Sequence, residues 1–128
     1  MIKITYTVFP RVDLDYRTAM RLWMEDHGAL VVRHAESLRL VRYVQTPRGV
    51  FAAVEAAMAR SRSIDPPHPL GLAELYWNSR EELDFSFTDP VARNAYRELL
   101  EDEKRFAEWK LSSPWIGEER VVIGAEAR

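Results

Sequence analysis

The spacing of the apolar residues changes several times along the chain, and the order of these changes restricts the fold. Apolar and polar residues alternate from residue 2 to Val8, as in a strand with one buried face. From Tyr16 to His34 the apolar residues recur every three or four positions, which predicts an amphipathic helix of about five turns. Asp15 is placed to cap this helix. The first third of the chain therefore predicts a strand followed by a helix.

Two further strands are predicted on either side of a long connecting segment. Residues 38–45 and 71–77 both carry the composition and alternation of strands. The connection, residues 47–70, is longer than a compact domain normally leaves without structure. We interpret it as an insertion that holds a short helix over residues 50–62, followed by a stiff proline-rich arm around His68.

The last third repeats the order of strand, helix and strand. Ser79 and Glu82 form a capping box, and Asp89 precedes a proline at the first helical position. Residues 118–124 predict a short final strand. The complete order predicts a ferredoxin-like α+β fold (βαββαβ), with an antiparallel four-stranded sheet and both main helices on one face. The chain length indicates a single domain over residues 1–128.

Composition excludes several classes of function. The chain has no cysteine, so disulfides, thiolate nucleophiles and cysteine-ligated metals are excluded. Its formal net charge of −2 provides no positive field to attract nucleic acid or anionic lipid. No apolar run is long enough for a membrane span, and the first residues do not resemble a signal peptide. We therefore expect a cytoplasmic protein that binds neither nucleic acid nor membrane.

One face of the predicted sheet has no cover within the chain. Several apolar side chains sort onto this face by their parity along the strands, and they are too apolar to lie in water. These residues are Leu40, Val44, Leu72 and Tyr76. A second copy packed against the face would bury them, so we expect a homodimer with Lys3, Arg42 and Glu74 pairing in or near its seam. The alternative is a monomer with one wetted sheet face, which antiparallel sheets tolerate.

The opposite face of the sheet is predicted to form the floor of a pocket. Tyr6, Tyr43 and Trp77 sort onto this face, and Trp23 and His27 lie on the helical stripe that packs against it. Aromatic walls around one imidazole suit a planar, apolar, oxygenated molecule. An imidazole can act as acid or base near neutral pH, and a tyrosine hydroxyl can stabilise an enolate oxygen. The alternative is that His27 is an ordinary core residue.

The spacing of the histidines argues against a metal site. His27 and His34 are seven residues apart, a rise of about 10 Å along a helix, which one metal ion cannot bridge. No other cluster of His, Asp or Glu completes a site, and we expect His34 to be structural. Asp26 points about 100° away from its neighbour His27 and is poorly placed to orient it. His68 is either a lid over the pocket or an ordinary loop residue.

Several segments together resemble the EthD family. Residues 22–31 (LWMEDHGALV) are similar to its first-helix pattern, an aromatic residue, then His, then Leu at spacings of four and three. Residues 71–83 and 88–106 are similar to its second half, in which an Ala-Glu-Leu strand, a Ser-capped helix and an acidic pair near a Phe follow one another. Residues 118–124 resemble its closing strand. The matching residues are Trp23, His27, Leu30, Ala73, Glu74, Leu75, Ser79, Asp102, Glu103 and Phe106.

This resemblance implies a dimeric α+β barrel built from two copies of the chain. Members of the wider group include 4-methylmuconolactone methylisomerase, polyketide cyclases and fungal polyketide dehydratases, which use neither metal nor organic cofactor. The resemblance places His27 and Tyr43 where methylisomerase-like members have a pocket histidine and a pocket tyrosine. His68 is the only candidate for a further pocket histidine of that enzyme.

We therefore expect a small cofactor-independent enzyme that transfers a proton next to a carbonyl, as an isomerase, cyclase or dehydratase does. Its substrate would be a hydrophobic carbonyl, lactone or polyketide-like metabolite. His27 would be the acid or base and Tyr43 would polarise the oxygen. The pocket would be lined by Tyr6, Trp23, Trp77 and His68. Two alternatives stay open: a non-catalytic binding or accessory protein of a catabolic pathway, and an antibiotic-biosynthesis-type monooxygenase or haem binder with His27 as axial ligand.

Overall fold

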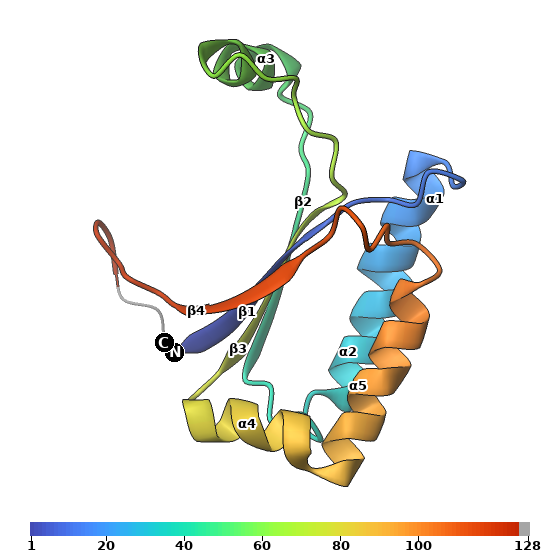
Figure 1. Cartoon of the computed structure of the whole chain (residues 1–128), viewed down its shortest axis with the longest axis vertical. Coiled ribbons are helices and arrows are strands. Elements are labelled where there is room, and N and C mark those ends of the chain that lie inside the picture. Colours follow the sequence, from blue (N-terminus) through green and yellow to red (C-terminus); the bar gives the residue numbers. More distant parts are fainter. Residues whose placement is uncertain (126–128) are drawn as a thin grey trace.

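The computed structural model describes residues 1–125, which form one antiparallel sheet with helices along one of its faces (Figure 1). The strand order is β2-β3-β1-β4, and every neighbouring pair is antiparallel. The strands are β1 (Ile2–Val8), β2 (Arg42–Pro47), β3 (Gly71–Trp77) and β4 (Pro114–Glu118). This is the ferredoxin-like α+β arrangement that was predicted from the order of the strand and helix patterns in the sequence.

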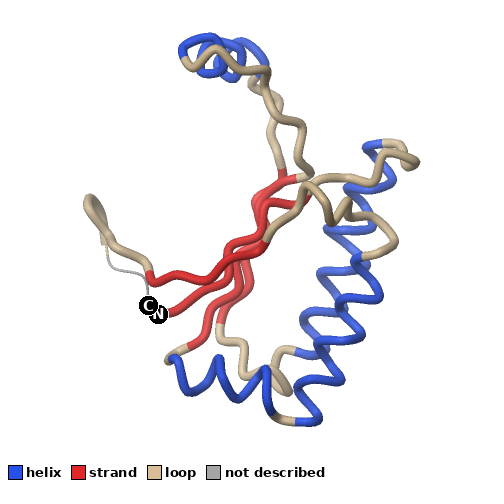
Figure 2. Tube along the Cα trace, viewed as in Figure 1, coloured by secondary structure: helices blue, strands red, loops and turns tan. Residues whose placement is uncertain are grey.

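Two long helical stretches lie along one side of the sheet, a shorter helix crosses the end of this side, and the helix of the insertion stands apart (Figure 2). The first long helix is continuous from Tyr16 to His34 but has a π-helical middle, so it is described as α1, η1 and α2. The helical segments are α1 (Tyr16–Arg21), η1 (Leu22–His27), α2 (Gly28–His34), α3 (Ala52–Ser61), α4 (Arg80–Thr88) and α5 (Pro90–Glu103). No helix among residues 1–125 is both long and apolar enough to cross a bilayer.

The predicted caps are confirmed at three helix starts. The side chain of Asp15 accepts a hydrogen bond from the backbone of Thr18 at 2.9 Å. Ser79 accepts one from the backbone of Glu82 at 3.2 Å, and Asp89 caps α5. Because these caps satisfy backbone N–H groups that a helix leaves free, they fix where the helices begin over the sheet.

The second strand begins four residues later than the sequence predicted. Residues 35–40 form the turn that ends the first helix, with the backbone of Leu40 donating to Ala35 at 2.9 Å and Arg39 at a positive φ of 55°. This turn carries Leu38 into the core, where it is 1% exposed, and Leu40 packs beside it against the helices. The prediction that Leu40 lies on the uncovered sheet face is therefore wrong.

The closing strand was predicted at residues 118–124, and this is also wrong. The strand is Pro114–Glu118, and its pairing partner explains where it ends. Glu118 already lies opposite Ile2, the first residue of β1, so β1 offers nothing further for the chain to pair with. Val122 and Ile123 are consequently exposed, although their composition suits a strand.

The insertion between β2 and β3 contains a helix, as predicted. Helix α3 stands at the tip of an arm that projects from the end of these two strands (Figure 1). Arg48 pairs with Glu55 at 3.0 Å and ties the base of the arm to the helix. Val50 and Phe51 nevertheless remain largely exposed.

Candidate functional site

A cavity of about 300 Å³ lies between the helices and the covered face of the sheet. Most of its wall is aliphatic or aromatic, which suits an apolar molecule of modest size. The residues of its wall with chemically useful side chains are Tyr6, Trp23, His27, Tyr43, Tyr96, Glu103, Trp109 and Ser112. The first helix, α5, the centre of the sheet and the segment that follows α5 all contribute to this wall.

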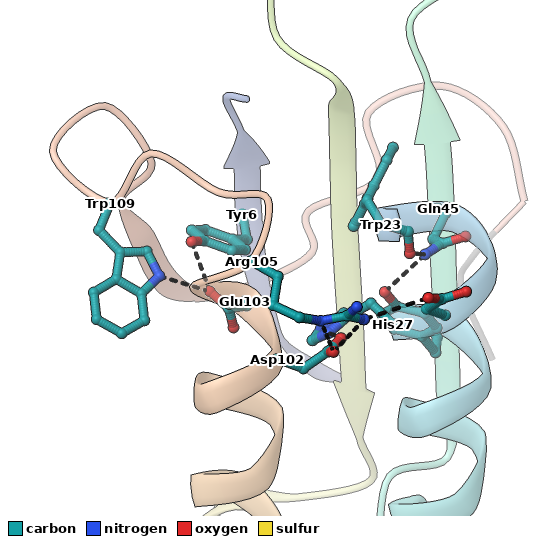
Figure 3. Close-up of polar contacts among 10 residues, drawn as sticks. Tyr6, Trp23, His27, Gln45, Asp102, Glu103, Arg105 and Trp109 are labelled. Carbon is teal, nitrogen blue, oxygen red and sulfur yellow. Dashed lines mark hydrogen bonds and ion pairs between the residues drawn. The ribbon is translucent and has the colours of Figure 1, made fainter. Parts of the chain in front are cut away.

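His27 is held at the cavity wall by a carboxylate from the other long helix. It is the last residue of η1 and is only 7% exposed. Its Nδ1 lies 2.8 Å from Oδ2 of Asp102, near the end of α5 (Figure 3). The ring of Phe106 packs edge-on against the imidazole, with 5.2 Å between the centroids. Within residues 1–125, Nε2 has no hydrogen-bond partner, and His27 is part of the cavity wall.

Asp102 is itself fixed by a cation. Its Oδ1 accepts a hydrogen bond from Nε of Arg105 at 2.8 Å, and a second guanidinium nitrogen lies 2.6 Å from the same oxygen. The hydrogen bond to Asp102 raises the pKa of Arg105. Arg105 also reaches Asp26 at 3.4 Å. Asp26 therefore contacts the site through Arg105 and not through its sequence neighbour His27.

The role of Asp102 was not predicted from the sequence, because 75 positions separate this residue from His27. No local spacing relates a residue on the first helix to one near the end of α5. The only available signal was the acidic pair before a Phe, which belongs to the EthD resemblance but indicates no role by itself.

Glu103 places a carboxylate in the cavity wall. Its Oε1 accepts hydrogen bonds from the hydroxyl of Tyr6 at 2.8 Å and from the indole N–H of Trp109 at 3.2 Å (Figure 3). Burial raises the pKa of Glu103 above its usual value. Burial and the neighbouring Glu103 likewise raise the pKa of Tyr6. Glu103 was not among the site residues predicted from the sequence.

Tyr43 enters the cavity from β2. Its hydroxyl oxygen accepts a hydrogen bond from Nε2 of Gln45 at 3.1 Å. Burial raises the pKa of Tyr43 to about 12, so the hydroxyl keeps its proton at neutral pH. The hydroxyl is thereby arranged to donate that proton to an oxygen of a bound molecule.

His27 lies in a π-helical turn that is linked to Tyr43 through Gln45. The carbonyl of Trp23 accepts the backbone N–H of Gly28, five residues on, and also accepts Nε2 of Gln45 at 3.0 Å. Such single π turns are frequent at functional sites. Gln45 thus links the Tyr43 hydroxyl to the helical turn that carries Trp23 and His27.

Two residues predicted to line the pocket lie elsewhere. Trp77 is on the covered face, as its parity requires, but it lies opposite Ile2, at the far end of β3 from the cavity. There it packs with Ile2, Ile4 and Leu83, and its indole N–H donates to the carbonyl of Leu38 at 2.8 Å. Parity fixes which face a strand residue occupies but not its position along the strand.

His68 also does not line the cavity. It is exposed in the proline-rich segment between α3 and β3. The carbonyl of the next residue, Pro69, accepts a hydrogen bond from the hydroxyl of Tyr16 at 2.6 Å, and the imidazole is not part of the cavity wall. The other four predicted pocket residues, Tyr6, Trp23, His27 and Tyr43, do line the cavity.

The residues predicted for a dimer seam lie together on the uncovered face. Nζ of Lys3 is 2.5 Å from Glu74 and 3.0 Å from Glu119. The guanidinium of Arg42 stacks over the ring of Tyr76 at 5.2 Å. No group of three or more possible metal ligands occurs within residues 1–125.

The sequence pattern that defines the EthD domain matches residues 11–109. The chain belongs to the EthD family. The match includes the first helix with His27 and the end of α5 with Asp102 and Glu103. No curated protein matches the chain at a significant level.

Solved structures with the same fold include an EthD family protein of Bacillus halodurans C-125, described as an ethyl tert-butyl ether D family protein. It shares 16% identity and a TM-score of 0.59, over 94% of this chain and 100% of the other. A dimeric ferredoxin-like protein of unknown function from Jannaschia sp. CCS1 shares 14% identity and a TM-score of 0.55, over 92% of this chain and 98% of the other. A third, from Bacteroides fragilis NCTC 9343, is also described as dimeric, with a ferredoxin-like fold and unknown function. It shares 13% identity and a TM-score of 0.50, over 92% of this chain and 95% of the other.

Proposed function

We propose that this EthD protein transfers a proton next to the carbonyl of a small hydrophobic molecule, as an isomerase, cyclase or dehydratase does. The observation that carries the proposal is the 2.8 Å contact between Nδ1 of His27 and Asp102, at the wall of an apolar cavity. A histidine fixed in this way by a carboxylate, with its other nitrogen open, is a common arrangement for a general base.

The direction of the hydrogen bond decides which nitrogen reacts. With Nδ1–H donating to Asp102, the neutral ring presents the lone pair of Nε2 to the cavity. When Nε2 takes a proton, the adjacent Asp102 stabilises the imidazolium that forms. The same Nε2 can then return the proton at another atom of the substrate, which completes an isomerisation.

Tyr43 supplies the partner for the negative charge that develops on the substrate oxygen. Its oxygen is occupied by the amide of Gln45, and its own proton remains free to donate. A hydrogen bond aimed at a developing enolate oxygen in an apolar site stabilises the transition state more than the ground state. The proposed step uses only side chains of this chain.

Hydrogen–deuterium exchange tests this function without knowledge of the natural substrate. β-Tetralone is a neutral bicyclic ketone with acidic protons next to its carbonyl, and NMR in D2O follows their loss. We expect the wild-type protein to accelerate this exchange and His27→Gln to abolish the acceleration. His34→Gln is the matched control, because His34 lies on the same helix but faces Glu98, at 3.3 Å, outside the cavity wall.

The outcomes of this experiment separate the two leading functions. Accelerated exchange that His27→Gln removes and His34→Gln retains supports the enzyme. Binding of β-tetralone by the wild-type protein without any acceleration would contradict the enzymatic proposal, and would favour a non-catalytic binding protein that uses the same cavity.

We also propose that the protein acts as a homodimer through the uncovered sheet face. Val44 and Leu72 lie on this face half-buried, and Trp115 of β4, paired with Thr5, adds a large ring that is 60% exposed. An exposed apolar sheet face of this kind is typical of an interface. The charged side chains of Glu74 and Glu119 on this face are already paired with Lys3, and two of the structural neighbours are described as dimeric.

A further inference from the structure

The charged groups of the cavity wall include a carboxylate but no lysine or arginine within residues 1–125. Within the same residues, the titratable side chains of the wall are those of His27, Glu103 and tyrosines. His27 contacts Asp102, which contacts Arg105, which contacts Asp26, so even a protonated imidazole is part of a group with two cations and two carboxylates. The cavity therefore presents either no net charge or a negative one.

Two cations that follow Glu103 in the chain, Lys104 and Arg105, are paired with other residues. Arg105 is bound by Asp102 and Asp26. Lys104 pairs with Glu101 at 2.8 Å and lies 5.9 Å from the centre of the Trp109 ring. Neither cation lines the cavity wall, so neither can offer a direct ion pair to an anionic ligand.

The two oxygens of Glu103 differ in what they can accept. Oε1 is occupied by the hydroxyl of Tyr6 and the indole N–H of Trp109. Oε2 accepts from no residue within 1–125, although Glu103 lines the cavity. Within that range this oxygen is a free hydrogen-bond acceptor, so a ligand in the cavity can donate a hydrogen bond to it.

We propose that Glu103 makes the cavity selective for neutral molecules that carry a hydroxyl group, which donates to Oε2, and excludes carboxylates and sulfonates. This inference rests on the cavity being the ligand site proposed above, and it adds the class of ligand that the site accepts. It assigns Glu103 to specificity and leaves the proton transfer to His27.

The physical reason is the cost of placing two negative groups together in an apolar space. Like charges in contact at an interface disfavour binding strongly, because low-polarity walls screen them poorly. A neutral hydroxyl avoids this repulsion and gains a charge-assisted hydrogen bond. Glu103→Gln removes the charge but keeps an amide oxygen to accept from Tyr6 and Trp109.

Calorimetric titration near neutral pH with β-naphthol and β-naphthalenesulfonate tests the inference, since the two probes share a ring system and differ in charge. We expect wild-type protein to bind β-naphthol at least about tenfold more tightly. In Glu103→Gln this preference should fall about tenfold, through tighter binding of the sulfonate. Glu101→Gln, an exposed residue two positions away, should leave the preference unchanged.

Equal affinity of the wild-type protein for the two probes would overturn the inference, as would a preference that Glu103→Gln leaves intact. Failure of both probes to bind would overturn it as well. Glu103→Met is a second uncharged variant, and thermal unfolding of each variant shows that it is folded. The two proposals are tested independently. If His27→Gln loses β-tetralone exchange but still prefers β-naphthol to the sulfonate, the selectivity of the cavity does not depend on the proposed reaction.

Discussion

Asp102 determines what the candidate base can do, although it does not line the cavity itself. It binds His27 through one oxygen and Arg105 through the other. In the proposed reaction, Asp102 would select the ring tautomer and the angle of the imidazole, and it would act on a ligand only through His27. It is therefore a positioning residue.

Asp102→Asn should slow the β-tetralone exchange by about 10²–10⁴-fold, the usual contribution of general acid–base catalysis. The amide cannot balance the imidazolium, and it can hold the ring in the wrong tautomer. The affinity for β-tetralone, measured by calorimetry, should remain within a few-fold of the wild-type value. An unchanged exchange rate in this variant would show that the carboxylate is only structural.

The raised pKa of Glu103 predicts a dependence of stability on pH. The folded state holds this proton more tightly than the unfolded chain. The contribution of Glu103 to the free energy of unfolding is therefore fully present at pH values below the pKa of the unfolded state. It is lost as the pH rises from the unfolded to the folded pKa, by at most about 1.4 kcal/mol per pH unit. Glu103→Gln should therefore gain stability relative to wild type as the pH rises from acid to neutral. Urea unfolding at several pH values measures this, and Glu101→Gln should show no such trend.

At the scale of the elements, one close contact holds the first helix against β2 and β3. Gly71 begins β3, and a Cβ at this position would lie 2.2 Å from the carbonyl oxygen of Thr46 and 2.8 Å from the ring of Trp23. Only glycine lets the strands and the tryptophan approach this closely. The same tryptophan belongs to the π turn that ends at His27.

Gly71→Ala should lower the free energy of unfolding by about 1–3 kcal/mol, because the added methyl group overpacks the contact. Gly28→Ala is the control, since its Cβ would meet Gln45 at 3.4 Å within a helix, where alanine is favoured by about 1 kcal/mol. We expect the changes in the free energy of unfolding caused by the two substitutions, measured by urea unfolding, to differ in sign or clearly in size. Equal effects would contradict the role given to Gly71.

Local sequence patterns predicted the kinds of elements but not all their ends. Capping residues and the change of period identified the helices, because those signals are local. The end of β4 depends on where its partner β1 begins, and the start of β2 depends on the turn at Arg39. The partners of the histidine depend in the same way on the packing of α5, and so Asp102 and Glu103 could not be found from spacing.

At the scale of the whole molecule, one side of the sheet is filled by helices and the other is open (Figure 2). The arm with α3 and the segment after β4 both extend beyond the sheet (Figure 1). This segment and the open face border a hollow of about 780 Å³ that includes Lys3, Arg42 and Tyr76. A second EthD chain on this face would cover the hollow and the apolar residues beside it.

Leu72→Glu should convert the proposed dimer to a monomer, because it places a charge among the apolar residues of the proposed interface. Analytical ultracentrifugation should give the mass of two chains for the wild type and of one chain for the variant. Val32→Glu is the control, since Val32 is 73% exposed on α2, on the helical side of the molecule. A wild-type protein that sediments as one chain would refute the proposed interface.

The most direct test of the proposed function is the state of the His27 imidazole, followed by long-range ¹⁵N–¹H NMR of protein labelled at its histidine nitrogens. We predict that neutral His27 carries its proton on Nδ1, toward Asp102, and that added β-tetralone shifts the Nε2 signal of His27 but not the signals of His34. A proton on Nε2 in the neutral ring, or a His27 spectrum that β-tetralone leaves unchanged, would contradict the assignment of His27 as the base in the cavity.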